Sequence, residues 1–101
     1  MMREMDICEY LEKRDPNDVI VDIRDKSAFE LGTVPGAVNI PMDNIRELYQ
    51  LPMDRDIYVF CKVGDISAEI VEILTDAGYN ACNLTGGYRK YLKKKLMEID
   101  I

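Results

Sequence analysis

One continuous stretch of this sequence is the most informative for the fold and for the chemistry: Ile57-Tyr58-Val59-Phe60-Cys61-Lys62-Val63-Gly64-Asp65-Ile66-Ser67-Ala68. Its first residues favour β structure and predict a short buried strand that ends at Cys61. The turn after the cysteine contains Gly64 and opens a helix. Backbone N–H groups at the start of a helix are unpaired and carry partial positive charge, so they favour an anion among them. The stretch therefore predicts a cysteine that the backbone can activate as a thiolate.

Length and composition predict one globular domain that spans residues 1–101. The chain is 48% hydrophobic and 32% charged, and a chain of this length can bury about 60–70% of its unfolded surface. Its net charge of −6 argues against nucleic acid and anionic membranes as partners. No apolar run approaches the roughly 20 residues of a transmembrane helix, and the N-terminus lacks the apolar core of a signal peptide. We therefore expect a cytoplasmic protein.

The cysteine and histidine counts exclude several kinds of chemistry. The three cysteines, Cys8, Cys61 and Cys82, form no C-x-x-C pair, which argues against a disulfide framework or a zinc site. We expect neither a metal nor a cofactor. The chain has no histidine, which a cysteine hydrolase normally needs to accept and return a proton. Sulfur transfer has no such need, because a thiolate can attack a sulfane sulfur and hold it as a persulfide.

Strand and helix patterns alternate along the chain. Apolar runs predict strands at 19–23, 37–40, 57–60 and 81–84. Helices are expected after a cap at Asp6, from 27 to 31, from a cap at Asp43 to before Pro52, from 66 to 77, and from 88 to 97. This alternation predicts an α/β fold with a mainly parallel central sheet and helices on both faces. The lysine-rich run 93–95 is interpreted as the solvated face of the last helix.

The helix after Cys61 has the clearest pattern. Gly78 is expected to end it, and Asp65 is a good residue to cap its start. Its wide apolar stripe is expected to face the core and consists of Ile66, Ile70, Val71, Ile73, Leu74 and Ala77.

In an open α/β sheet, binding sites form beyond the carboxyl ends of the strands. The loops after Ile23, Ile40, Phe60 and Leu84 are therefore expected to share one end of the molecule. Cys61 lies in that set, and Gly64 allows successive N–H groups to point inward and form an anion-binding nest.

The residues alone leave two interpretations of Cys61 open. It is either a reactive thiol in a nest or a small buried apolar residue at the end of a strand. Cys8, on the first helix, and Cys82, within a core strand, are interpreted as structural. A role for Cys82 as a resolving thiol stays open.

Four segments in order resemble the rhodanese-like domain, from about Asp6 to Lys94. They are Val19–Arg24 with its D-x-R, Phe29–Pro41 with its P-G-A-x-N-I-P, Val59–Ala68 as the C-x-x-G catalytic loop, and Tyr79–Tyr91 with Gly86-Gly87. The resemblance implies a single-domain sulfurtransferase, an enzyme that transfers sulfur from thiosulfate or a persulfide. Cys61 would be the persulfide carrier, and the substrate-binding loop would consist of Lys62, Val63, Gly64, Asp65 and Ile66.

Three positions depart from the family pattern. Thr33 replaces a histidine and Tyr91 replaces a tryptophan, and both changes are expected to affect packing. Ile66 stands where many active members have an arginine that would bind an anionic donor. Lys62 is the only remaining cation of the loop, and Asp65 offsets its charge. We therefore expect weak thiosulfate activity and a better fit to protein-bound or low-charge persulfide donors.

Asp22 and Arg24 are expected to support the loop from the neighbouring strand end. Arg24 either reaches the loop carbonyls or Asp65, or forms an ordinary ion pair with Asp22 or Asp25. The structural role in shaping the loop is the favoured interpretation.

Two other classes of function compete with sulfur transfer. An inactive rhodanese-like module would bind a protein partner or act in regulation, which the missing arginine supports. A cysteine phosphatase or arsenate reductase would need an arginine six residues after the cysteine, where this chain has Ser67. The expected partner is a small sulfur donor or a persulfide-carrying protein, and the sequence does not set the oligomeric state.

Overall fold

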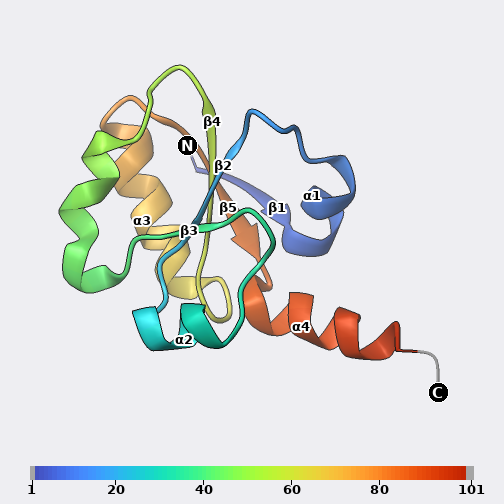
Figure 1. Ribbon diagram of the computed structural model, residues 1–101. Helices are drawn as coiled ribbons and strands as arrows, with labels where there is room; N and C mark the ends of the chain where they lie inside the picture. Colours follow the sequence, from blue (N-terminus) through green and yellow to red (C-terminus); the bar gives the residue numbers. More distant parts are fainter. Residues whose placement is uncertain (1, 100–101) are drawn as a thin grey trace.

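The chain alternates strands and helices in the computed structural model, which describes residues 2–99 (Figure 1). The strands are β1 (Arg3–Asp6), β2 (Val19–Asp22), β3 (Val38–Asn39), β4 (Asp56–Phe60) and β5 (Asn80–Thr85). The helices are α1 (Ile7–Lys13), α2 (Lys26–Leu31), the 3₁₀ segment η1 (Met42–Gln50), α3 (Asp65–Asp76) and α4 (Gly87–Met97).

All neighbouring strands pair in parallel, in the order β1-β5-β4-β2-β3. In the middle of the sheet, Val59 of β4 lies opposite Val21 of β2 and Asn83 of β5. The predicted parallel α/β architecture is therefore confirmed. Because the strands run in the same direction, the loops that follow β2, β4 and β5 lie at one end of the sheet.

Two apolar clusters cover the two faces of the sheet, as predicted for helices on both sides. One cluster joins β4 to α3 and η1 through residues such as Val59, Val71 and Leu48. The other joins the opposite face to α1 through Ile7 and Tyr10, with α4 packed against it. Figure 1 shows α3 and η1 on one side of the strands and α1 on the other. The central strands are buried on both faces, which explains their continuous apolar runs.

The four predicted strands are present, and the structure adds a fifth, β1. The sequence pattern gave no sign of β1, because its residues Arg3–Asp6 are polar or half-exposed. This strand lies at the edge of the sheet and pairs only with β5, so it needs no apolar run of its own.

The segment after β3 differs from the predicted helix. It forms the 3₁₀ segment η1, which begins after Pro41 rather than at a cap by Asp43, and Asn44 has non-helical angles inside it. Pro41 has extended backbone angles, and its fixed φ is compatible with that conformation directly before η1.

Helix α3 also corrects the predicted apolar stripe. Ile70, Val71 and Leu74 are buried, but Ile66 and Ile73 are 45% and 53% exposed. The cap is Gly64, in the left-handed region, and Asp65 is the first helical residue. Gly78 follows the end of the helix with a φ of 96°, as predicted for a C-terminal glycine.

No helix within residues 2–99 has the length and apolar character needed to cross a membrane.

Asp6 connects the N-terminal elements to α4. Its carboxylate accepts hydrogen bonds from the backbone N–H groups of Cys8 and Glu9 at the start of α1, and it pairs with Lys90 of α4. Burial works to raise the pKa of this carboxyl, but the hydrogen bonds from Lys90 and from the two N–H groups outweigh it and lower the pKa below its ordinary value. The ionised carboxylate therefore stabilises the fold.

We expect Asp6→Ala to reduce the free energy of unfolding near neutral pH by about 1 kcal/mol, the usual value of a helix cap. A carboxyl with a lowered pKa contributes fully above its unfolded value of 3.8, and this contribution is lost as the pH falls further. Urea unfolding at several pH values measures both effects. Asp6→Asn keeps a capping oxygen and should lose less. If the free energy of unfolding of Asp6→Ala stays below that of the wild type by the same amount from pH 7 to pH 2, this assignment is wrong.

Candidate functional site

Cys61 lies directly after β4, at the carboxyl end of the sheet. Cys61 is only 4% exposed, and it lines the floor of an open hollow of about 810 Å³. The neighbouring strand end is fixed to this point, because the Ile23 N–H donates to the Phe60 carbonyl at 3.1 Å. The structure thus places the thiol where the sequence predicted a site, at the end of the strands.

Two backbone N–H groups point at the thiol. Gly64 N lies 3.1 Å and Ser67 N 3.4 Å from the Cys61 Sγ. Gly64 has a φ of 100°, a conformation that side chains rarely adopt, and it is the residue directly before the first turn of α3. The sulfur therefore lies against the N-terminal end of α3, where it receives the partial positive charge of the helix.

The carbonyl groups of the loop are held by a second helix. Tyr88 N donates to the Cys61 carbonyl at 2.9 Å, and Arg89 N donates to the Lys62 carbonyl at 3.0 Å. These are free N–H groups of the first turn of α4, so the contacts satisfy both the helix start and the loop. With the carbonyls turned outward to α4, the loop can present its N–H groups inward to the sulfur.

The double glycine makes this contact possible. A Cβ atom on Gly87 would lie 2.6 Å from the carbonyl oxygens of both Cys61 and Lys62, closer than real atoms approach. Gly86 also lies against the loop, because a Cβ atom on Gly64 would meet its nitrogen at 3.2 Å. The sequence predicted only a turn at Gly86-Gly87, and its contact with the loop that follows Cys61 was missed.

A carboxylate lies close to the thiol. The Asp65 Oδ1 is 3.7 Å from the Cys61 Sγ, and it also accepts a hydrogen bond from the Ile66 N–H at 2.8 Å. The predicted role of Asp65 as the helix cap is wrong, since Gly64 has that position. Its negative charge suits the first turn of α3, but it repels an anion at the sulfur.

Behind the sulfur lies a buried polar chain that the sequence analysis did not assign. The Ser67 Oγ is 3.2 Å from the Cys61 Sγ and 2.6 Å from the Asn83 Oδ1, and the Asn83 Nδ2 donates to the Gly64 carbonyl at 3.1 Å. Ser67 and Asn83 are 0% and 1% exposed. A polar residue within the apolar run of β5 was the one signal in the sequence that pointed to such a buried partner.

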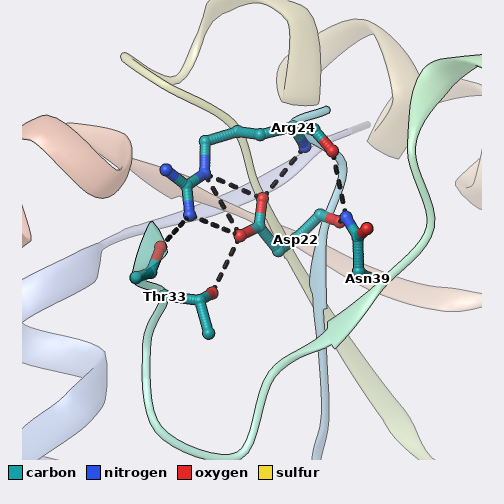
Figure 2. Close-up of polar contacts among 5 residues, drawn as sticks. Asp22, Arg24, Thr33 and Asn39 are labelled. Atoms are coloured by element: carbon teal, nitrogen blue, oxygen red, sulfur yellow. Dashed lines mark hydrogen bonds and ion pairs between the residues drawn. The ribbon is translucent and has the colours of Figure 1, made fainter. Parts of the chain in front are cut away.

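Asp22 and Arg24 form a buried ion pair at the end of β2 (Figure 2). The Arg24 Nε and Nη2 donate to the Asp22 carboxylate at 2.7–3.1 Å, and Thr33 Oγ1 donates to the same carboxylate at 2.8 Å. The Asn39 side chain donates to the backbone carbonyls of both residues. Of the two alternatives for Arg24, these contacts match the ion pair with Asp22 and not a direct contact with the loop carbonyls or Asp65. Thr33, which stands in place of the family histidine, belongs to the same cluster.

Arg24 reaches the site through an aromatic ring. Its guanidinium lies over the ring of Tyr88, 3.9 Å from the centroid, and also donates to the Gly32 carbonyl at 2.6 Å. Tyr88 is the residue whose N–H group holds the Cys61 carbonyl. The end of β2 therefore supports the loop indirectly, by packing against the first turn of α4.

The rim of the hollow is apolar with a few charged groups. Met42, Ile66 and Leu92 contribute partly exposed apolar side chains from three separate elements. Lys62 and Arg89 bring cations to the same rim. The sequence predicted Lys62 as the only cation of the loop, and the fold adds Arg24 from the end of β2 and Arg89 from α4. Val63 is also exposed, at 42%.

The other two cysteines occupy different surroundings. Burial raises the pKa of the Cys82 thiol, and burial together with the Asp6 charge raises that of Cys8. Cys82 belongs to the apolar cluster on one face of the sheet and Cys61 to the cluster on the other. The sheet separates these two thiols, so Cys82 does not lie where a resolving cysteine would have to be.

The arrangement suits a nucleophilic thiol that holds a second sulfur. Backbone N–H groups can stabilise negative charge on the sulfur, and the hollow above it admits a donor. Within residues 2–99, no group of three or more histidine, cysteine, aspartate or glutamate side chains is placed to hold a metal ion.

Comparisons with known proteins agree with this geometry. The family model described as "Rhodanese-like domain" matches residues 8–94. A "Sulfurtransferase" of Allochromatium vinosum is 36% identical over 92 residues, which cover 86% of this chain and 85% of the relative. A crystal structure of a rhodanese-related protein from Thermoplasma volcanium superposes with a TM-score of 0.82 at 26% identity, covering 91% of this chain and 92% of that one.

Larger proteins contain a similar segment. The "Adenylyltransferase and sulfurtransferase UBA4" of Meyerozyma guilliermondii is 31% identical over 99 residues, which cover 88% of this chain. The chain spans only 23% of that relative's length.

We expect Gly87→Ala to disturb the loop as well as the stability. The left-handed conformation and the contacts at 2.6 Å should together lower the free energy of unfolding by about 2 kcal/mol or more. Iodoacetamide alkylation of Cys61 should slow in the folded variant, because the N–H groups no longer face the sulfur. Gly78→Ala is the matched control, since Gly78 also has a positive φ but is approached only by Met53 at 3.2 Å. Equal alkylation rates in the two variants would refute the role of this contact.

Proposed function

The chain belongs to the rhodanese-like domain family, and on that premise we propose that it is a sulfurtransferase or persulfide carrier that uses Cys61. The single observation that carries this proposal is the position of the Cys61 Sγ, which faces two backbone N–H groups at the floor of an open hollow. Relatives named as sulfurtransferases support the transferase class.

The proposed reaction has two displacement steps. The Cys61 thiolate attacks the sulfane sulfur of a donor, so that a bond forms between the two sulfurs and the bond within the donor breaks. The electron pair of that bond leaves with the rest of the donor, as a thiolate or as sulfite. A thiol of the acceptor then attacks the outer sulfur and regenerates the Cys61 thiolate. No outside oxidant or reductant is needed.

The loop contributes binding and charge stabilisation to these steps. The N–H groups of Gly64 and Ser67 stabilise negative charge on the Cys61 sulfur, and Lys62 and Arg89 lie at the rim where a donor enters. Asp22 and Arg24 act at a distance, by holding the end of β2 and the ring of Tyr88 in place.

The charges near the sulfur favour a donor of low charge. The carboxylate of Asp65 lies 3.7 Å from the sulfur, whereas the cations are placed on the rim of the hollow. Because Coulomb repulsion grows as the distance falls, this carboxylate acts strongly against a dianion that must touch the sulfur. The apolar rim of Met42, Ile66 and Leu92 suits a thiol of a small molecule or of a protein.

We expect a sulfur adduct on the wild-type protein after exposure to a cysteine persulfide, and a smaller one after thiosulfate. Intact-protein mass spectrometry detects the added sulfur, and cyanide should remove it. Cys61→Ser should carry no such adduct, while the half-buried Cys8 and the buried Cys82 remain as internal controls. If neither donor loads a folded, reduced protein, sulfur transfer is wrong and a module that binds a protein partner becomes the better assignment.

We expect Ile66→Arg to raise the rate of thiosulfate turnover about tenfold or more, which corresponds to one charge-assisted hydrogen bond. Ile66 is 45% exposed on the rim, so an arginine has room there. Ile73→Arg is the matched control, because Ile73 is 53% exposed on the same helix two turns further from the sulfur. A cyanide-coupled assay measures the turnover. An unchanged rate in Ile66→Arg, or an equal rise in both variants, would show that charge at this position does not limit the reaction.

A further inference from the structure

We propose that Ser67 and Asn83 set the charge state of Cys61, with the Ser67 hydroxyl shared between two competing acceptors and Asn83 as a positioning residue that acts through it. The inference rests on the proposed function in one respect only, that Cys61 is the reacting thiol.

The geometry fixes the direction of the hydrogen bonds. The Asn83 Nδ2 donates to the Gly64 carbonyl at 3.1 Å, so the Oδ1 end of the same amide faces Ser67. That oxygen can only accept, and the Ser67 Oγ lies 2.6 Å from it. The Ser67 hydroxyl therefore donates to Asn83. Turning the amide over would place its oxygen against the Gly64 carbonyl oxygen, where neither could donate.

The Ser67 hydroxyl has one hydrogen, and Asn83 holds it in this arrangement. The side of the Ser67 Oγ that faces the Cys61 Sγ, 3.2 Å away, then offers a lone pair. A neutral thiol can donate its S–H hydrogen to that lone pair or to the Asp65 Oδ1, which lies 3.7 Å from the sulfur. A thiolate has no hydrogen to donate, and its charge would face the lone pair. This arrangement favours the thiol.

Ionisation of Cys61 changes the pairing. The S–H proton leaves to solvent through the hollow, and the Ser67 hydroxyl rotates to donate to the sulfur. A hydrogen bond to an ionised group is about twice as strong as a neutral one, which favours the rotation. The Asn83 Oδ1 then loses its donor inside the protein, which costs free energy. Ser67 therefore stabilises the thiolate, and Asn83 opposes it by competing for the same hydrogen.

The competition also favours loading of the sulfur. In a persulfide the negative charge moves to the outer sulfur, and the inner Cys61 sulfur becomes neutral. The Ser67 hydroxyl can then return to Asn83. The competing acceptor at Asn83 thus raises the energy of the free thiolate relative to both the resting thiol and the persulfide, although the Ser67 hydroxyl still stabilises the thiolate.

Other charges around the thiol stay constant in the variants that test this idea. Asp65 of α3 lies 3.7 Å from the sulfur, and Lys62 belongs to the loop itself. Arg24 and Asp25 after β2, and Arg89 of α4, line the same hollow. Because none of these residues is altered, they cancel in comparisons between variants.

The experiment is the pH dependence of iodoacetamide alkylation of Cys61 in the full chain. Trypsin releases residues 56–62 as a peptide that contains Cys61 and no other cysteine, so mass spectrometry reads this site alone. Ser67→Ala should move the pH of half-maximal rate upward by about one unit, as expected for the loss of one hydrogen bond to a charged group. Asn83→Leu should move it downward. Ser67→Ala/Asn83→Leu should behave as Ser67→Ala does.

The double variant separates a relay from general damage to the loop. If Asn83 acts through the hydroxyl, Asn83→Leu has no further effect once that hydroxyl is gone. The proposal fails if Asn83→Leu raises the pH of half-maximal rate, or if Ser67→Ala leaves it unchanged. It also fails if the double variant differs from Ser67→Ala by the shift that Asn83→Leu causes alone. Ser67→Thr keeps the hydroxyl and should keep the wild-type profile. Asn83→Val, with a side chain suited to a strand, replaces Asn83→Leu should the latter not fold.

Alkylation needs no sulfur donor, so the two proposals fail separately. If the protein takes up no sulfur while Ser67→Ala shifts the profile upward and Asn83→Leu shifts it downward, the relay is retained and the sulfurtransferase assignment is lost. If Cys61 takes up sulfur but the two variants do not shift the profile in these two directions, the assignment is retained and the relay is lost.

Discussion

The chemistry of this site depends on two backbone hydrogen bonds, from the N–H groups of Tyr88 and Arg89 to the carbonyls of Cys61 and Lys62. They use helix-start donors that have no partner within α4, and they turn the loop so that its own N–H groups face the sulfur. The approach is close enough that Gly87 has no room for a side chain. One segment late in the chain thereby fixes the conformation of a loop more than twenty residues earlier.

Two polar clusters, each with a buried side chain at its centre, support the loop around the thiol. The Asp22 and Arg24 pair, joined by Thr33 and Asn39, fixes the end of β2 and the position of the Tyr88 ring. The Ser67 and Asn83 pair lies behind the sulfur and holds the Gly64 carbonyl. Buried polar groups of this kind are costly unless each has a partner, and here their hydrogen bonds connect elements that are distant in the sequence. They restrict the loop to one conformation, which is what preorganised stabilisation of charge requires.

The charge distribution gives this member of the family its own character. The helix start and the loop N–H groups attract an anion to the sulfur, while Asp65 at 3.7 Å repels one. Ile66 adds no charge, and Arg24, Lys62 and Arg89 line the same hollow together with Asp25. A site with this balance stabilises a single charge on sulfur better than it binds a dianion. Under the function proposed above, Ile66 in place of an arginine changes the class of donor that fits and leaves the thiol available for sulfur transfer.

The sequence by itself determined the alternation of elements, the parallel sheet and the position of Cys61 at a strand end, because apolar periodicity and glycine turns are local signals. The sequence pattern did not predict β1, because its mostly polar residues carry no such signal. It also predicted that Ile66 faces the core, because an apolar stripe on a helix does not show where the core ends. The tertiary structure alone decided which distant groups meet at the thiol. Ser67, Asn83 and the first turn of α4 come together only when parallel strands align their carboxyl ends, and no spacing along the chain encodes those contacts.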